Sequence, residues 1–188
     1  MTDTVTRAMK RPGVVPAALT GLGVLAALLA INFVQGLFSA LGLAATATID
    51  QSYLGAIWFG QLVGSLTGPL PFAIGYFLCL WQVAPIAPKL RLAHVVTRAL
   101  LACLLGAPVI WIVAWVMQLV VDVSSFAPEF QGGILIGKLG PDALVALFHA
   151  LAITAGYVPV GLLAAILLWG WLQRHPLEKA VHGTLDEV

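Results

Sequence analysis

The chain has 188 residues, of which 61% are apolar and only 9% are charged. A soluble domain is about half apolar and about a quarter charged, so water is excluded as the main solvent, and the mean hydropathy of +1.01 indicates lipid instead. The formal net charge of +1 excludes a strongly basic surface for nucleic acid. We therefore expect an integral membrane protein whose first partner is the lipid bilayer.

Four uncharged stretches are long enough to cross a bilayer, which takes about 20 apolar residues in a helix. They predict an all-α integral membrane protein with four transmembrane helices, arranged up-down-up-down in a bundle that forms a single membrane domain. The predicted spans are residues 14–49, 51–88, 99–121 and 143–173. Residues 1–13 and 174–188 are then the cytoplasmic ends, and residues 122–142 are the outer loop.

The basic residues predict the orientation of these spans. Eight of the nine lie in the N-terminal segment, in residues 89–98 or in the C-terminal tail, and only Lys138 lies in the other two connections. Basic loops stay on the cytoplasmic side of a membrane. We therefore expect a multi-pass protein of a bacterial cytoplasmic membrane, with both termini in the cytoplasm.

The first predicted span carries two amides and a row of small side chains. Asn32 and Gln35 are three residues apart, so they share a helix face near the middle of the membrane, where an amide needs a partner. Gly36, Ala40 and Ala44 are four residues apart. Such spacing allows another helix to approach closely.

The second predicted span repeats that spacing with Gly60, Gly64 and Gly68. The two rows flank the short outer connection, so they can face each other in an antiparallel pair. Internal packing of the first two helices is the interpretation we favour, and a docking face for another subunit is the alternative.

Prolines interrupt the second and fourth spans. Pro69 and Pro71 predict a kink in the second, because proline removes a helix hydrogen bond and clashes with the preceding turn. Residues 53–67 then form either the outer half of a bent span or a helix at the outer interface. Pro159 predicts a second kink, in the fourth span.

Ionisable side chains inside a membrane are candidate functional groups because they are costly to place there. Asp122 ends the third predicted span, and His149 lies about two turns into the fourth. Both are expected near the outer boundary, so they can form a polar pair there. Such a pair is either a proton or ion site or an interfacial contact without a further role, and we favour the latter.

Two tyrosines lie close to the prolines in sequence, Tyr76 after Pro71 and Tyr157 before Pro159. Together with Asn32 and Gln35 they either line a polar pocket for a neutral ligand or hold the bundle together by interhelical hydrogen bonds. The second interpretation is favoured, since such bonds are common between membrane helices.

A search for catalytic and metal-binding patterns gives none in the sequence. Cys79 and Cys103 stand alone in apolar runs, and no group of cysteines and histidines has the spacing of zinc ligands. His94 and His149 are expected on opposite sides of the membrane and cannot share a haem. We predict no catalytic residue, no metal, no cofactor and no enzymatic activity.

Two function classes remain. The first is a non-catalytic accessory or assembly subunit of a larger bacterial membrane protein complex, favoured by the small-residue rows and the scarcity of intramembrane charge. The alternative is a small transporter, or the substrate-binding membrane component of a multi-subunit importer, for a neutral or apolar ligand. The predicted kinks and the mid-membrane amides favour that alternative.

Overall fold

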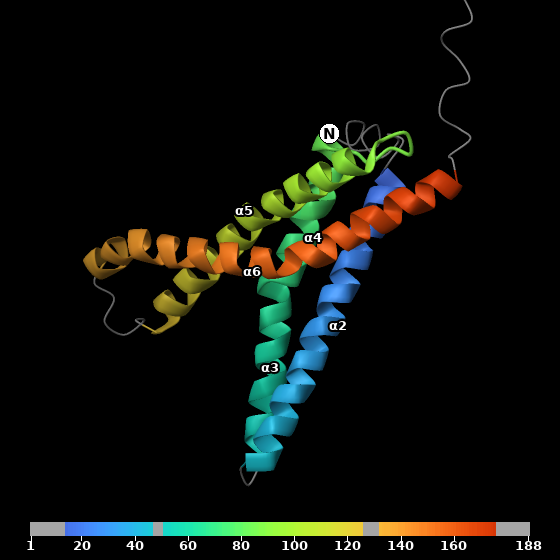
Figure 1. Cartoon of the computed structure of the whole chain (residues 1–188). Coiled ribbons are helices and arrows are strands. Elements are labelled where there is room, and N and C mark those ends of the chain that lie inside the picture. The colour runs from blue at the N-terminus through green and yellow to red at the C-terminus, as the bar shows by residue number, and fades with distance from the viewer. Residues whose placement is uncertain (1–13, 47–50, 126–131, 176–188) are drawn as a thin grey trace, which may run out of the picture.

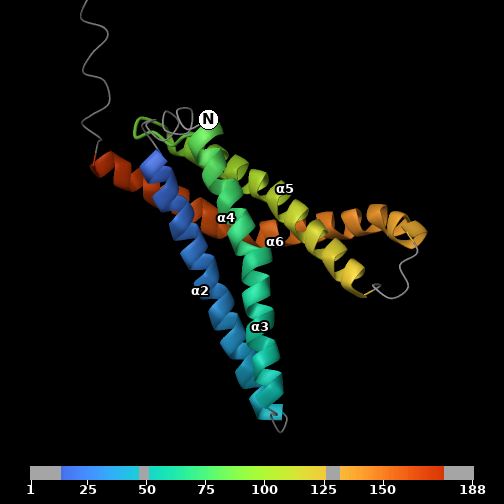
Figure 2. The same ribbon diagram turned by 180° about the vertical axis from the view of Figure 1, so that it is seen from behind.

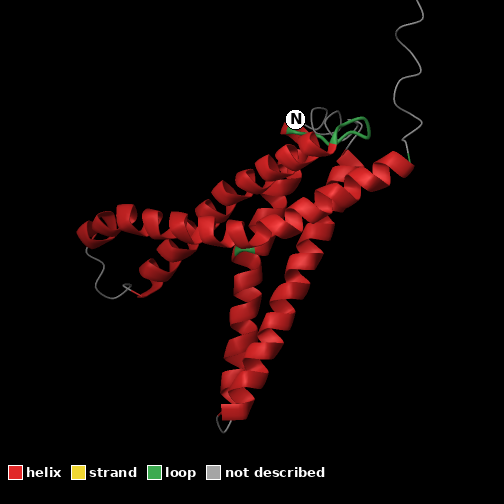
Figure 3. Cartoon of the chain, viewed as in Figure 1, coloured by secondary structure: helices red, strands yellow, loops and turns green. Residues whose placement is uncertain are grey.

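The computed structural model describes residues 14–46, 51–125 and 132–175. Nearly all of these residues are helical, and none of them forms a strand, so the predicted all-α class is confirmed for this part of the chain (Figure 3). The elements in chain order are α2 (Val14–Thr46), α3 (Gln51–Thr67), α4 (Pro69–Leu78), the π-helical turn η1 (Cys79–Val83), α5 (Leu92–Ser125) and α6 (Gly132–Arg174).

Four stretches of the described helices are long and apolar enough to cross a membrane. They are Val14–Gly42, Gly55–Val83, Leu92–Val120 and Gly140–Arg174. The second combines α3, α4 and η1, which follow one another almost without interruption. Length and composition therefore agree with the predicted number of four spans.

A break at Gly68 separates α3 from α4, and it appears as a short loop in Figure 3. Pro69 is the first residue of α4, a position where the missing amide hydrogen leaves no further group unpaired. Backbone hydrogen bonds bridge the break, from Gly68 N to Gly64 O (3.0 Å) and from Phe72 N to Gly68 O (3.1 Å). The interruption thus lies beside the predicted prolines, although a membrane kink there stays a prediction.

Helix α6 remains continuous through both of its prolines, Pro141 and Pro159. The outer-loop prediction is therefore wrong for residues 122–125 and 132–142, which are helical. Pro141 therefore lies inside the helix and not in a loop before it; a proline within a helix is tolerated in an apolar environment where neighbours satisfy the freed groups.

The second predicted span ends earlier than expected. Helical structure stops at Val83, and residues 84–88 are irregular. Pro85 and Pro88 explain this end, since each disfavours helical geometry in the residue before it. The connection is held in place by the Arg98 guanidinium, which donates to Pro85 O, and by Trp169 Nε1, which donates to Leu90 O at 3.0 Å.

The helices form two hairpins that meet at one end and diverge at the other (Figures 1 and 2). We call the shared end the joint; it comprises residues 14–28, 68–110 and 150–174. The first arm is formed by residues 29–46 and 51–67, and the second arm by residues 111–125 and 132–149. The four helices therefore pack together over only part of their length, unlike the bundle that we predicted.

The joint is closely packed because glycines let three helices approach one another. A Cβ atom on Gly75 of α4 would lie only 2.8 Å from Gly106 Cα of α5, and one on Gly106 would lie 2.6 Å from the Phe72 ring. On α6, a Cβ on Gly161 would lie 2.6 Å from Cys103 Sγ. Larger residues at these positions would force the backbones apart.

Candidate functional site

The first polar contact connects α2 of the first arm with α6 of the joint. The Asn32 side chain lies close enough to the Tyr157 hydroxyl to interact with it. The Tyr157 hydroxyl also lies against the break between α3 and α4, since a Cβ on Gly68 would be 2.9 Å from its oxygen. These contacts bring three segments together where the arms begin to diverge.

The second polar contact connects α4 with α6. The Tyr76 side chain is completely buried, and its hydroxyl donates to Gly161 O at 2.7 Å. The Phe72 ring lies beside both tyrosines, with centroid distances of 6.0 Å to Tyr76 and 5.3 Å to Tyr157. Each tyrosine therefore presents its ring to the core and its hydroxyl to a polar partner.

Gln35 does not join this group. Its side chain is exposed on α2, whereas that of Asn32, three residues earlier, is partly buried. The four residues were expected either to line one polar pocket or, as favoured, to connect helices. The structure brings Asn32 close to Tyr157, bonds Tyr76 to Gly161 and leaves Gln35 exposed. None of the four lines the three cavities described below.

The small-residue rows are divided between inside and outside. Gly36 is buried, and a Cβ there would lie 3.1 Å from the side chain of Gln61. Gly60 and Gly64 are exposed, with no atom of the described chain within 4 Å of an added Cβ. The glycines of the two rows therefore do not contact one another, because the Gln61 side chain of α3 packs against Gly36 instead.

The remaining members of the rows are less informative. Ala40 is partly buried on α2, and the side chain of Ala44 lies outside the described structure. Gly68 is buried against Tyr157. Of the glycines in the two rows, only Gly60 and Gly64 are therefore open, and they lie one turn apart on α3.

A cavity of about 420 Å³ lies in the fork between α3 of the first arm and the helices of the second arm. Four polar residues line it, Thr67 from α3, Gln118 from α5, and Asp142 and His149 from α6. Its other lining residues are apolar: Val63, Ala114, Met117, Val145 and Ala146.

The predicted outer pair is only half represented in this cavity. His149 is exposed and lines it, whereas Asp122 belongs to α5 and its side chain lies outside the described structure. The carboxyl group that lines the cavity with His149 is that of Asp142, which we had assigned to the outer loop. The spacing of seven residues, two helical turns, could have identified this pair.

One oxygen of the Asp142 carboxyl group has no hydrogen-bond donor among the described residues. This oxygen, Oδ2, is buried. Three other buried polar atoms of the described residues also lack partners: Trp81 Nε1, Trp115 Nε1 and Thr154 Oγ1. Asp142 is the one acid among the residues whose side chains are described, so its carboxyl group is the most costly of the four to leave unpaired.

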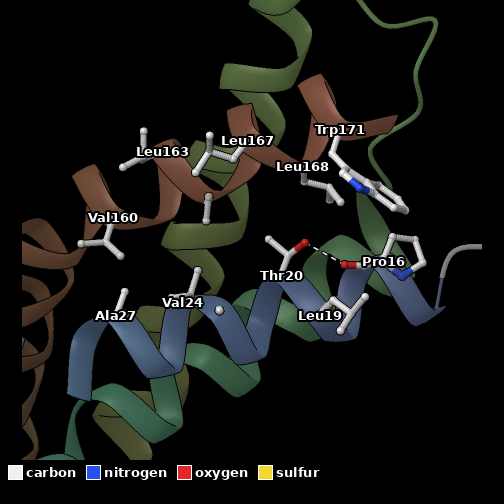
Figure 4. A pocket seen from close by; sticks show the side chains of 12 residues that line it. Pro16, Leu19, Thr20, Val24, Ala27, Val160, Leu163, Leu167, Leu168 and Trp171 are labelled. Carbon is white, nitrogen blue, oxygen red and sulfur yellow. Dashed lines mark hydrogen bonds between the residues drawn. The ribbon is translucent and has the colours of Figure 1, made fainter. Parts of the chain in front are cut away.

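A second cavity, of about 440 Å³, is a groove between α2 and α6 (Figure 4). Its walls carry leucine, valine and alanine side chains, with Trp171 at one end. The one polar side chain is that of Thr20, whose hydroxyl donates to Pro16 O at 2.7 Å. With this hydroxyl satisfied, the groove offers mainly apolar packing surface, beside the indole of Trp171.

A third cavity, of about 320 Å³, lies between α2 and α4 and is lined by apolar residues such as Leu22, Ala73 and Phe77. Within residues 14–46, 51–125 and 132–175 no three metal-ligating side chains gather. Comparison with models of protein families, with curated proteins and with solved structures gave no match to this chain. The site must therefore be interpreted from its own chemistry.

Proposed function

We propose that the protein is a non-catalytic accessory or assembly subunit of a larger complex in a bacterial cytoplasmic membrane. The observation that carries this proposal is the first arm, which diverges from the second arm (Figure 1) and leaves large apolar side chains such as Phe38 and Phe59 mostly exposed. In the most apolar 18-residue window of each candidate span, only 17% to 44% of the residues are buried inside the protein. Most of the apolar surface is therefore left for lipid or for another protein.

The open glycines on α3 favour a protein. Apolar side chains gain little by leaving lipid for one another, so membrane helices associate where small residues let their backbones approach. Gly60 and Gly64 offer such a surface and contact no described residue of their own chain. A helix of a partner subunit can reach the backbone there more closely than anywhere along the leucine-rich faces.

Partner retention tests this role. We expect the protein, tagged at its native locus and purified at native expression levels, to carry a larger membrane protein in stoichiometric amount, detected by mass spectrometry. Gly64→Leu should lose that protein, since the added side chain would hold the partner helix away. Gly156→Leu is the matched control, because Gly156 is also exposed with nothing within 4 Å. Equal retention by both variants would contradict the proposed docking face.

The orientation with both termini in the cytoplasm is part of the proposal, supported by the distribution of basic residues. Single cysteines at Thr4, Ser125 and Val188, in a background without Cys79 and Cys103, test it with a membrane-impermeant thiol reagent. In intact cells we expect labelling at Ser125 alone. Labelling at either terminus would overturn the four-span orientation.

The second candidate function is a small transporter or the substrate-binding membrane component of an importer for a neutral or apolar ligand. The cavity in the fork favours it, since binding sites in proteins are largely apolar with a few convergent polar groups. Kinks at Pro69 and Pro159 would let such arms move. The absence of any stoichiometric partner, together with a ligand-dependent rise in melting temperature, would favour this candidate over the accessory subunit.

A further inference from the structure

The cavity in the fork is the most polar of the three cavities, and its polar groups come from three different helices. Thr67 lies one residue before the break in α3, Gln118 lies in the second arm on α5, and Asp142 and His149 lie two turns apart on α6. We propose that this cavity binds a small amphiphilic organic cation, with its ammonium group on the carboxylate of Asp142. This proposal goes beyond the accessory role and requires no partner subunit.

The carboxylate supplies the first argument. Asp142 Oδ2 is buried without a hydrogen-bond donor, and no lysine or arginine lines the cavity. A buried carboxylate oxygen without a donor is unfavourable, and an opposite charge that donates to it relieves that cost. A ligand ammonium supplies both the charge and the donor, and the resulting charge-assisted hydrogen bonds are among the strongest that proteins form.

The neighbouring polar groups supply the second argument. The Thr67 hydroxyl already donates to Val63 O at 3.0 Å, so its oxygen is left as an acceptor. The Gln118 amide and the His149 imidazole can each donate as well as accept. The carboxylate of Asp142 and the Thr67 oxygen only accept, so a ligand with N–H groups fits the cavity.

The apolar side chains that line the cavity indicate an apolar body for the ligand beside its ammonium group. Val63, Met117 and Val145 line the cavity beside the polar groups, and a thioether adapts readily to aromatic or aliphatic shapes. A cavity of about 420 Å³ falls in the range of small-molecule sites. One carboxylate and one imidazole are fewer ligands than protein metal sites ordinarily use, so an organic cation suits the cavity better than a metal ion.

Binding of 2-phenylethylammonium to the purified full-length chain tests the proposal, with 2-phenylethanol as the uncharged counterpart of similar shape. We expect saturable binding of the ammonium in isothermal titration calorimetry and at least about tenfold weaker binding of the alcohol, the ratio expected when a charge-assisted contact is lost. The alcohol partitions better into detergent, so this preference cannot arise from partitioning. Equal affinity for the two compounds, or no saturable binding of the ammonium, would overturn the proposal.

Two variants locate the site. Asp142→Asn should weaken ammonium binding at least about tenfold and leave the melting temperature of the unliganded protein equal or higher, because it removes an unpaired carboxylate. Ala114→Leu should abolish binding by filling the cavity, whereas Ala152→Leu, exposed on α6 and outside the lining, should not change it. If Asp142→Asn fails to fold, the comparison of Ala114→Leu with Ala152→Leu tests the location of the site.

Parent-like affinity in Asp142→Asn or in Ala114→Leu would contradict the assignment. Gly64→Leu should bind the ammonium like the parent, because Gly64 is not among the residues that line the cavity. A loss of partner retention without a loss of ammonium binding therefore separates the subunit role from the cavity.

Discussion

The joint and the first arm are built from similarly apolar helices, yet they use their glycines in opposite ways. In the joint, Gly75 and Gly106 lie where α4 crosses α5, so close that a single methyl group would strike the neighbouring backbone or ring. In the first arm, Gly60 and Gly64 are exposed and contact nothing. At these four positions the same residue type closes the α4–α5 crossing and leaves the face of α3 open, although Gly36 of the first arm is buried against Gln61 and Gly156 of the joint is exposed.

Completely buried side chains show the same division. In the joint, the side chains of Phe72, Tyr76 and Ile110 are completely buried. In the first arm, Phe38 is 71% exposed and Phe59 is 68% exposed. Specific packing in a membrane depends on close fit and hydrogen bonds, since burial from lipid alone contributes little. The joint therefore supplies the stability of the chain, and the first arm supplies surface.

The largest expected effect comes from the crossing in the joint. Gly75→Leu should destabilise the protein by about 3 kcal/mol or prevent folding, because its Cβ would lie 2.8 Å from Gly106 Cα and from Leu105 O. Gly60→Leu should change stability by less than about 0.5 kcal/mol, since it meets open space. Unfolding in detergent, followed by circular dichroism, measures both, and similar losses in the two variants would contradict the division between joint and arm.

A smaller effect is expected from the hydrogen bond between α4 and α6. Tyr76→Phe keeps the buried ring but removes the hydrogen bond that the hydroxyl donates to Gly161 O. We expect a loss of about 1 kcal/mol with unchanged helix content. A variant as stable as the parent would show that this contact is not part of what holds α6 in the joint.

The smallest effect distinguishes the two amides of α2. Asn32→Leu should lower stability by about 1 kcal/mol or less, because it removes the polar contact with Tyr157. Gln35→Leu should not lower stability, because Gln35 is exposed. Where lipid surrounds the position, an apolar side chain is even preferred to an amide. Equal effects of the two substitutions on stability would contradict this distinction between Asn32 and Gln35.

Helical class and the four long apolar stretches follow from composition and the positions of charges, which is why they could be predicted. The interruption beside Pro69 followed from the missing amide hydrogens of proline. The ends of α5 and α6 could not be obtained in this way, because Gly132 and Pro141 signal a loop in water but stand in a continuous helix here. Divergence of the two hairpins depends on contacts between distant segments, which local patterns do not contain.

The candidate sites were predicted less completely for a similar reason. Spacing placed Asn32 and Gln35 on one face, yet a separation of three residues turns the side chains far enough apart that one meets Tyr157 and the other faces outward. Asp142 was missed because its helix was expected to begin there, so its seven-residue spacing from His149 was not considered. The glycine rows identified the right helices, but only the structure shows that Gln61 fills the space at Gly36.

The central claim is that the open face of α3 contacts a partner helix, and site-specific photocrosslinking tests it most directly. A photoreactive residue at Ala56 lies one turn before Gly60 and is exposed, while the same residue at Leu104 samples an exposed face of α5. In native membranes we expect one discrete adduct with a different and larger membrane protein from Ala56, lost in Gly64→Leu, and no such adduct from Leu104. An adduct of the chain with itself, or no protein adduct from Ala56, would contradict the claim.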